Sequence, residues 1–275
     1  MDTEQAVASH YTQGDFEARL LAMLAATGKD AAHLTADDLT PIEEFHIGGR
    51  EATVALAGQM QLRPGMHLLD IGSGIGGPAR YFARAQGCTV TGIDLTDEFV
   101  AIASSLSTRV GLADRVTFRQ GSALAMPFGP GSFDGAYMLH VGMNIPDKSG
   151  LFAEVHRVLK PGALFAVYDI LRLAGGDLVF PLPWSSGPET SFVAPATTYR
   201  DGLAAAGFTI LAEHARGQFA IEFFRAMRAR AAEAGSSRPN LQSVMGADAA
   251  LKSANLFAAL ERGLVAPVEM IARAD

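Results

Sequence analysis

A carboxylate followed by a run of glycines is the most chemically suggestive feature of this sequence. Residues His67–Gly77 read H-L-L-D-I-G-S-G-I-G-G, so an apolar run ends at Asp70 and four glycines follow within six residues. The next residues, 78–83, read P-A-R-Y-F-A and have helical character. A strand, a tight glycine turn and a helix let a ligand approach bare backbone at the positive end of the helix dipole.

The glycine pattern alone leaves two kinds of ligand open. Gly72, Gly74 and Gly77 satisfy G-x-G-x-x-G, which is the fingerprint of a dinucleotide site. Asp94 follows at about the distance expected of an acid that binds a ribose. One interpretation of the chain is therefore a nicotinamide-dependent oxidoreductase.

Asp70 distinguishes between the two ligands. A carboxylate at the strand end repels a pyrophosphate and attracts an ammonium group. S-Adenosylmethionine carries an ammonium group and a sulfonium and has no phosphate, and its ribose still needs an acid such as Asp94. Asp70 therefore favours this cofactor, although the same side chain could also cap a helix or form a turn. A protein that binds the cofactor without catalysis is a further alternative.

Two histidines are candidate catalytic bases. His140 ends a predicted strand beside the cofactor site, and His46 lies in the segment 43–50, E-E-F-H-I-G-G-R. Displacement at a sulfonium needs alignment and exclusion of water, and it needs a base only when the acceptor must lose a proton. Each histidine could instead hydrogen-bond to the cofactor or the backbone. Glu43 and Glu44 could bind a cationic acceptor or cap a helix, and we predict no metal site.

Alternating strands and helices must position these residues. The predicted strands are 66–71, 88–95, 116–120, 133–140, 163–170, 208–213 and 264–272. The predicted helices are 15–26, 51–61, 78–86, 96–112, 148–159, 198–206, 219–234 and 247–261. This alternation is typical of βαβ units. We predict an α/β fold with a Rossmann-like doubly wound sheet, mostly parallel with a last antiparallel strand, N-terminal helices and a helical insertion before that strand.

Polar residues and glycines lie at the carboxyl ends of five of the predicted strands. They are Asp70-Ile71-Gly72, Asp94, Gly121-Ser122, His140 and Asp169. Ligands of open α/β sheets bind beyond the carboxyl ends of the strands, so these residues are expected to meet at one edge of the sheet.

Several of these stretches resemble class I S-adenosylmethionine-dependent methyltransferases. D-I-G-S-G-I-G-G resembles their motif I, and G-I-D-L resembles their ribose-binding strand end. F-D-G-A-Y-M-L-H and E-V-H-R-V-L-K-P-G-A-L-F-A-V-Y-D resemble their fourth and fifth strands with the intervening helix. The resemblance covers about residues 43–215 and is closest to the small-molecule branch, which includes sarcosine/dimethylglycine, phosphoethanolamine, sterol and tocopherol methyltransferases. It implies transfer of a methyl group from S-adenosylmethionine to an N, O or C atom of a small-molecule acceptor.

The resemblance also implies site residues. The implied cofactor-binding residues are Asp70, Gly72, Ser73, Gly74, Gly76, Asp94, Leu95, Gly121, Ser122, Ala123, Leu139 and His140. The implied substrate-binding residues are Glu44, Phe45, His46, Met143, Asn144 and Trp184. The family often has an acid after the glycine that ends strand three, where it pairs with the adenine amino group. This chain has Ser122 there, so its adenine contacts stay open.

Composition restricts the partners and the compartment. The net charge is −7, from 22 basic and 29 acidic residues, and no basic run stands out, which argues against nucleic acid. A single cysteine, Cys88, suits a reducing cytoplasm. The acidic start lacks the apolar stretch of a signal peptide, and no apolar run is long enough to span a membrane.

We predict two units along the chain. Residues 1–60 form a helical cap, and residues 61–275 form the cofactor-binding domain, with a helical lid at 217–262. The sequence allows a homodimer and does not identify the acceptor.

Overall fold

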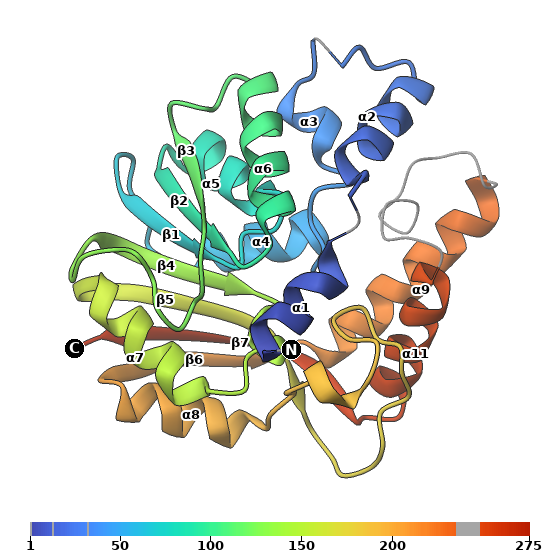
Figure 1. The fold of residues 1–275 in the computed structure, drawn as a ribbon. Helices are drawn as coiled ribbons and strands as arrows, with labels where there is room; N and C mark the ends of the chain where they lie inside the picture. Colours follow the sequence, from blue (N-terminus) through green and yellow to red (C-terminus); the bar gives the residue numbers. More distant parts are fainter. Residues whose placement is uncertain (1, 13, 32, 235–247) are drawn as a thin grey trace.

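A computed structural model describes residues 2–12, 14–31, 33–234 and 248–275, which form a seven-stranded sheet in the order β3-β2-β1-β4-β5-β7-β6 (Figure 1). The strands are β1 (His67–Ile71), β2 (Thr89–Asp94), β3 (Val116–Gln120), β4 (Phe133–Leu139), β5 (Leu159–Arg172), β6 (Phe208–Ala215) and β7 (Val265–Ala274). β1 to β5 pair in parallel, and β7 is antiparallel to β5 and β6. The predicted α/β sheet with a last antiparallel strand is confirmed.

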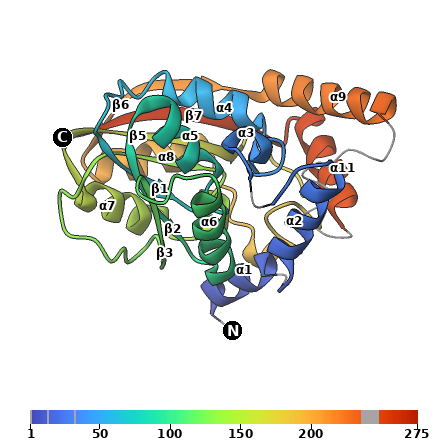
Figure 2. The same ribbon diagram turned by 90° about the horizontal axis from the view of Figure 1, so that it is seen from above.

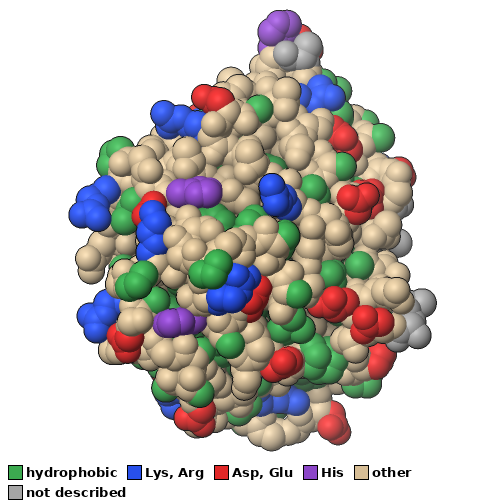
Figure 3. Space-filling model, turned by 60° about the vertical axis from the view of Figure 1, so that its left-hand side comes forward, with side chains coloured by type: hydrophobic (Ala, Val, Ile, Leu, Met, Phe, Trp, Pro, Cys, Tyr) green, Lys and Arg blue, Asp and Glu red, His purple; other side chains and the backbone are tan. Residues whose placement is uncertain are grey.

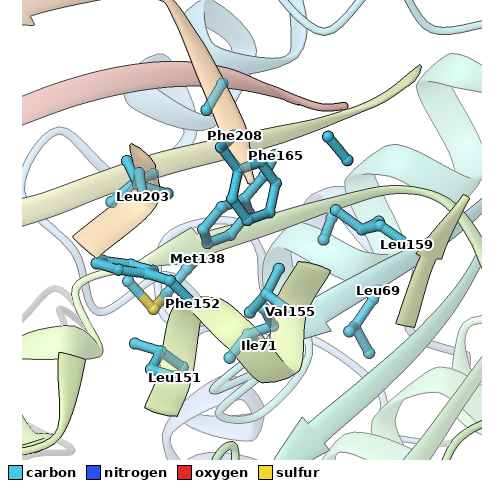
Figure 4. Close-up of a cluster of buried hydrophobic side chains, with 14 of the residues drawn as sticks. Leu69, Ile71, Met138, Leu151, Phe152, Val155, Leu159, Phe165, Leu203 and Phe208 are labelled. Atoms are coloured by element: carbon cyan, nitrogen blue, oxygen red, sulfur yellow. The ribbon is translucent and has the colours of Figure 1, made fainter. Parts of the chain in front are cut away.

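Helices cover both faces of the sheet because its buried strands are apolar on both sides. These helices are α4 (Gly49–Ala57), α5 (Gly77–Gln86), α6 (Asp97–Arg109), α7 (Lys148–Val158) and α8 (Ala196–Ala205). Leu68 packs with α4 and α5, whereas the next residue, Leu69, packs in the cluster formed with α7 and α8. Figure 4 shows Phe152 and Val155 of α7 in that second cluster, near the strand residue Phe165. Because successive residues of a strand pack against helices on opposite faces, a shift by one residue would move both side chains to the wrong face. This packing therefore keeps the carboxyl ends of the strands in register.

Two elements near the functional edge illustrate how the observed boundaries differ from the predicted ones. The helix predicted at 51–61 begins at Gly49 and ends at Ala57, after Gly48 has taken the left-handed conformation with φ 90°. The strand predicted at 163–170 runs from Leu159 to Arg172, because it continues to pair with β7 as far as Arg172.

Helical segments from both ends of the chain flank the carboxyl edge of the sheet (Figures 1 and 2). The N-terminal ones are α1 (Thr3–Tyr11), α2 (Phe16–Ala26) and α3 (Ala36–Leu39). The C-terminal ones are α9 (Gly217–Ala234) and α11 (Ala249–Glu261), which pack against each other through Phe224 and Phe257. Part of the predicted lid, residues 235–247, lies outside the described residues, as does the predicted first residue of its second helix, Ala247.

The surface carries charges of both signs. On the face in Figure 3, basic and acidic side chains are interspersed, without a broad area of either colour. No helix in the part of the chain that the structure describes combines the length and apolarity needed to cross a membrane.

Candidate active site

A cavity of about 2120 Å³ opens at the carboxyl edge of the sheet. The ends of β1, β2, β3 and β4 form its floor, and α1, the segment 43–51, α9 and α11 form its other walls. Sites for single small ligands usually measure about 300–1,000 Å³. The cavity therefore has room for two molecules side by side.

The structure brings nearly all of the predicted site residues to this cavity. Its walls include Asp70, Gly72, Ser73, Gly74, Asp94, Leu95, Gly121, Ser122, Ala123, Leu139, His140, Glu44, Phe45, His46, Met143, Asn144 and Trp184. Gly76 is the exception, since it does not reach the cavity wall. It precedes α5 with φ 83°, and a Cβ atom there would lie 2.6 Å from the Phe118 ring and 2.9 Å from the Arg80 guanidinium. Gly76 therefore serves the turn, and its predicted place at the cofactor stays a prediction.

Asp94 organises the glycine turn. The Gly74 amide donates a 2.8 Å hydrogen bond to Asp94 Oδ2, and the Thr96 amide donates a 2.9 Å bond to Oδ1. A carboxylate can accept about four hydrogen bonds, so both oxygens keep capacity for a diol. Gly72 has φ 70°, and a Cβ atom there would clash with Val141. The turn thus presents bare backbone next to an acceptor-rich side chain.

Asp70 is a buried carboxyl group that lacks a cation. Its side chain lines the cavity although the residue is only 2% exposed, and Oδ2 has no hydrogen-bond partner among the described residues. Burial raises its pKa to about 8, and the nearby Asp94 and Glu44 carboxylates add to this effect. A cationic group in the cavity would reverse it.

His140 presents a free ring nitrogen. It follows β4 with φ 56°, a left-handed conformation that is uncommon for a residue with a side chain. Its amide donates to Tyr168 O at 2.7 Å, its ring stacks on Tyr168, and Nε2 has no partner in the described part of the chain. Burial holds the pKa of His140 well below its usual value, so the imidazole is neutral.

His46 is also neutral but is held by its neighbours. Its Nε2 lies 3.0 Å from Gly49 O, to which it donates, and 3.1 Å from Thr53 Oγ1. Burial lowers its pKa to about 4. Its ring centroid is 6.0 Å from that of His140.

Glu43 and Glu44 form a buried ion-pair network. Glu43 accepts from Arg80 at 2.7 Å and from Arg50 at 2.6 Å. Glu44 accepts from Arg50 Nε and, at 2.5 Å, from Thr53 Oγ1. Neither carboxylate caps a helix. Because the two arginines neutralise these acids, the network's evident effect is to hold the segment 43–50 against α5.

The side of the cavity toward α9 and α11 is apolar. The apolar side chains there are Ile47, Met143, Trp184, Phe223, Phe224, Met227 and Leu256. Asn144 supports this wall from within: it donates to Trp184 O at 2.8 Å and to Thr190 O at 3.1 Å, and it accepts from Tyr11 at 2.9 Å.

Sequence reasoning predicted a cap and a lid but named no individual site residue in α1 or in the lid helices. Glu4 and Tyr11 of α1, and Phe223 and Phe224 of α9, line the cavity. Phe223 and Phe224 lie in the helix predicted at 219–234. The periodicity of that helix predicts that one face is buried, but not that this face lines a cavity. No local pattern shows that α1 reaches strands more than a hundred residues away.

Comparisons with known proteins agree with this architecture. Residues 69–167 match the family model described as "Methyltransferase domain". A sterol 24-C-methyltransferase of Eremothecium gossypii is 34% identical over 170 residues, which are 58% of this chain and 45% of that protein. The chain thus spans less than half the length of the curated relatives it matches.

Two solved structures share the fold over most of this chain. The phosphoethanolamine N-methyltransferase 2 of Haemonchus contortus, in complex with S-adenosyl-L-methionine, superimposes with a TM-score of 0.73 at 20% identity and covers 94% of this chain and 60% of that one. The [4+2]-cyclase SpnF superimposes with a TM-score of 0.65 at 25% identity and covers 93% of each chain. Since one fold hosts different reactions, the reaction must be argued from the cavity.

Proposed function

We propose that this chain, a member of the class I S-adenosylmethionine-dependent methyltransferases, transfers the methyl group of that cofactor to a small-molecule acceptor. The methyltransferase-domain match and the sterol methyltransferase relatives support the family and the cofactor. The single observation that carries the proposal is the buried Asp70 carboxyl group, which has no cationic partner among the described residues, on the wall of a cavity with room for two molecules.

The residues present fit the cofactor. Asp70 would bind its ammonium group, Asp94 would bind its ribose diol, and Gly72 and Gly74 would let it approach the backbone. The walls beside Leu95, Gly121, Ser122, Ala123 and Leu139 would take the rest of the nucleoside. The Asp70 carboxylate would pair with an ammonium group and would repel a pyrophosphate at the same place, which argues against a nicotinamide cofactor. When bound, the cofactor supplies an activated methyl group on a sulfonium.

The protein's own part is alignment, exclusion of water and acceptance of a proton. Neutral His140, which lines the cavity and whose Nε2 has no partner among the described residues, is the proposed general base for an acceptor that must lose a proton. His46 is the second candidate, and its bond to Gly49 gives it mainly an orienting role. Both line the cavity beside the proposed cofactor position.

The acceptor side favours an apolar small molecule. Phe45, Met143 and Trp184 would contact it, whereas Glu44 and Asn144 act by holding those walls in place. We propose residues 1–60 as a cap and 217–262 as a lid over this chamber. The curated relatives act on sterols by name, and the apolar lining is compatible with acceptors of that class.

The cellular setting follows from composition. We propose a reducing cytoplasmic compartment, because the single cysteine, Cys88, leaves no internal disulfide to form. The acidic net charge supports a partner other than nucleic acid. A homodimer stays a proposal that sedimentation of the purified chain can test.

Ligand-dependent melting separates the candidate functions. S-Adenosylhomocysteine should raise the melting temperature and NADH should not. Stabilisation by NADH alone would overturn the proposal in favour of an oxidoreductase. Turnover is then measured as release of S-adenosylhomocysteine with a panel of apolar metabolites. Binding without release on any acceptor would favour a non-catalytic cofactor-binding protein.

A further inference from the structure

Glu4 of α1 reaches the loop that follows β3. Ser122 Oγ donates a 2.5 Å hydrogen bond to Glu4 Oε1 and accepts a 3.0 Å bond from the Leu124 amide. Both Glu4 and Ser122 line the cavity. The Ser122 hydroxyl proton therefore points at the Glu4 carboxylate. Ser122 holds Glu4 in place and does not compete with it for a ligand's donor. In the described part of the chain, no hydrogen bond is made to Glu4 Oε2.

This pair stands next to the acid proposed for the ribose. β2 and β3 are neighbours in the sheet, and the Gly121 amide donates a 2.9 Å bond to Asp94 O. The cavity wall around them is apolar, with Leu95, Ala123 and Phe99. A flat base attached to a ribose at Asp94 would find apolar walls for its faces and a carboxylate at its edge.

Polar contacts from three of its residues hold α1 in this position. Besides the Glu4 contact, Tyr11 donates to Asn144 at 2.9 Å, and His10 Nε2 lies 3.1 Å from Pro183 O. Val7 on the same helix is buried. The helix is thus attached to loops after β3, β4 and β5, and its acid is held at the edge of the cavity.

We propose that Glu4 recognises the exocyclic amino group of the cofactor's adenine, so that a residue from the N-terminal helix determines the base selectivity of the site. The inference rests on the proposed function. An amino group donates to a carboxylate, whereas the carbonyl oxygen of hypoxanthine can only accept and would face the same negative charge. A site built for a donor rejects an analogue that lacks it. Ser122 orients Glu4 for this contact.

Calorimetry with two ligands tests the assignment. The probes are S-adenosylhomocysteine and S-inosylhomocysteine, which differ at this position of the base. The parent should bind the adenosine compound about 10- to 100-fold more tightly, as expected for a hydrogen bond to a charged group. Glu4→Ala should lose that preference, with its affinity for the inosine compound unchanged or improved. Glu4→Gln should lie between the two.

Controls keep the outcomes distinct. Glu17→Gln removes another N-terminal acid, one that accepts from Ser105 outside the cavity, and should keep the preference. Thermal unfolding of each variant measures whether it is still folded, so that a lost preference is not caused by unfolding. An unchanged ratio of affinities in Glu4→Ala overturns the inference while the proposed function stands. A parent that binds neither compound overturns the proposed function, and the assignment of Glu4 with it.

Discussion

His46 and His140 meet edge to face in the cavity wall, with ring centroids 6.0 Å apart and planes at 78°. The two rings share a buried setting and a lowered pKa, yet they differ in what their nitrogens contact. His46 Nε2 is held by Gly49 O, whereas His140 Nε2 has no partner among the described residues. The difference supports the proposal that His46 mainly orients and that His140 accepts the proton.

Replacement of His140 should therefore reduce turnover. His140→Asn is the suitable variant, because asparagine tolerates the left-handed backbone that φ 56° requires. With any acceptor that loses a proton, the turnover rate should fall by about 10²- to 10⁴-fold. The affinity for S-adenosylhomocysteine should change by only a few fold. His67→Asn, at a histidine outside the cavity, is the control. An unchanged rate would exclude His140 as the base.

Asp70 should reduce the stability of the ligand-free protein as pH rises. Its folded-state pKa of about 8 lies above the unfolded value of about 3.9, so the folded state binds the proton more tightly. Below pH 4, this proton makes its full contribution to the free energy of unfolding. The contribution is lost progressively as the pH rises to 8. Asp70→Asn stays neutral throughout, so at pH 8 it should be more stable than the parent by about 2–5 kcal/mol. Urea unfolding at pH 5 and pH 8 measures this, and an equal difference at both values would contradict it.

The same group should make cofactor binding depend on pH. An ammonium ligand pairs with the Asp70 carboxylate, and binding must release the proton that burial retains below pH 8. The affinity for S-adenosylhomocysteine should rise by up to tenfold per unit between about pH 6 and pH 8, since an α-amino group is protonated in that range. Calorimetry in buffers of different ionisation enthalpy counts the released proton. Asp70→Asn should bind weakly and lose most of this dependence; a parent with a flat profile would contradict the ion pair.

Much of this site could be predicted from the sequence because its parts are local. The glycines, Asp70 and Asp94 follow apolar runs directly, and parallel strands necessarily bring their carboxyl ends to one edge. The contacts of Glu4 could not be predicted, because Ser122 stands 118 residues away and helical periodicity does not give a docking position. Glu44 was expected at the acceptor, but its neutralisation by Arg50 depends on how the segment 43–50 folds back.

Gly76 and Gly72 offer a final comparison between a glycine needed by the fold alone and one that both the fold and the ligand need. Gly76→Ala places a Cβ atom against Phe118 and Arg80 and forces a side chain into φ 83°, which costs about 1–2 kcal/mol before any clash. Its melting temperature should fall, while the folded fraction binds S-adenosylhomocysteine as the parent does. Gly72→Ala, at φ 70° on the cavity wall, should lose stability and also most of the affinity. If Gly76→Ala instead weakened binding at temperatures where it is fully folded, Gly76 would contact the cofactor after all.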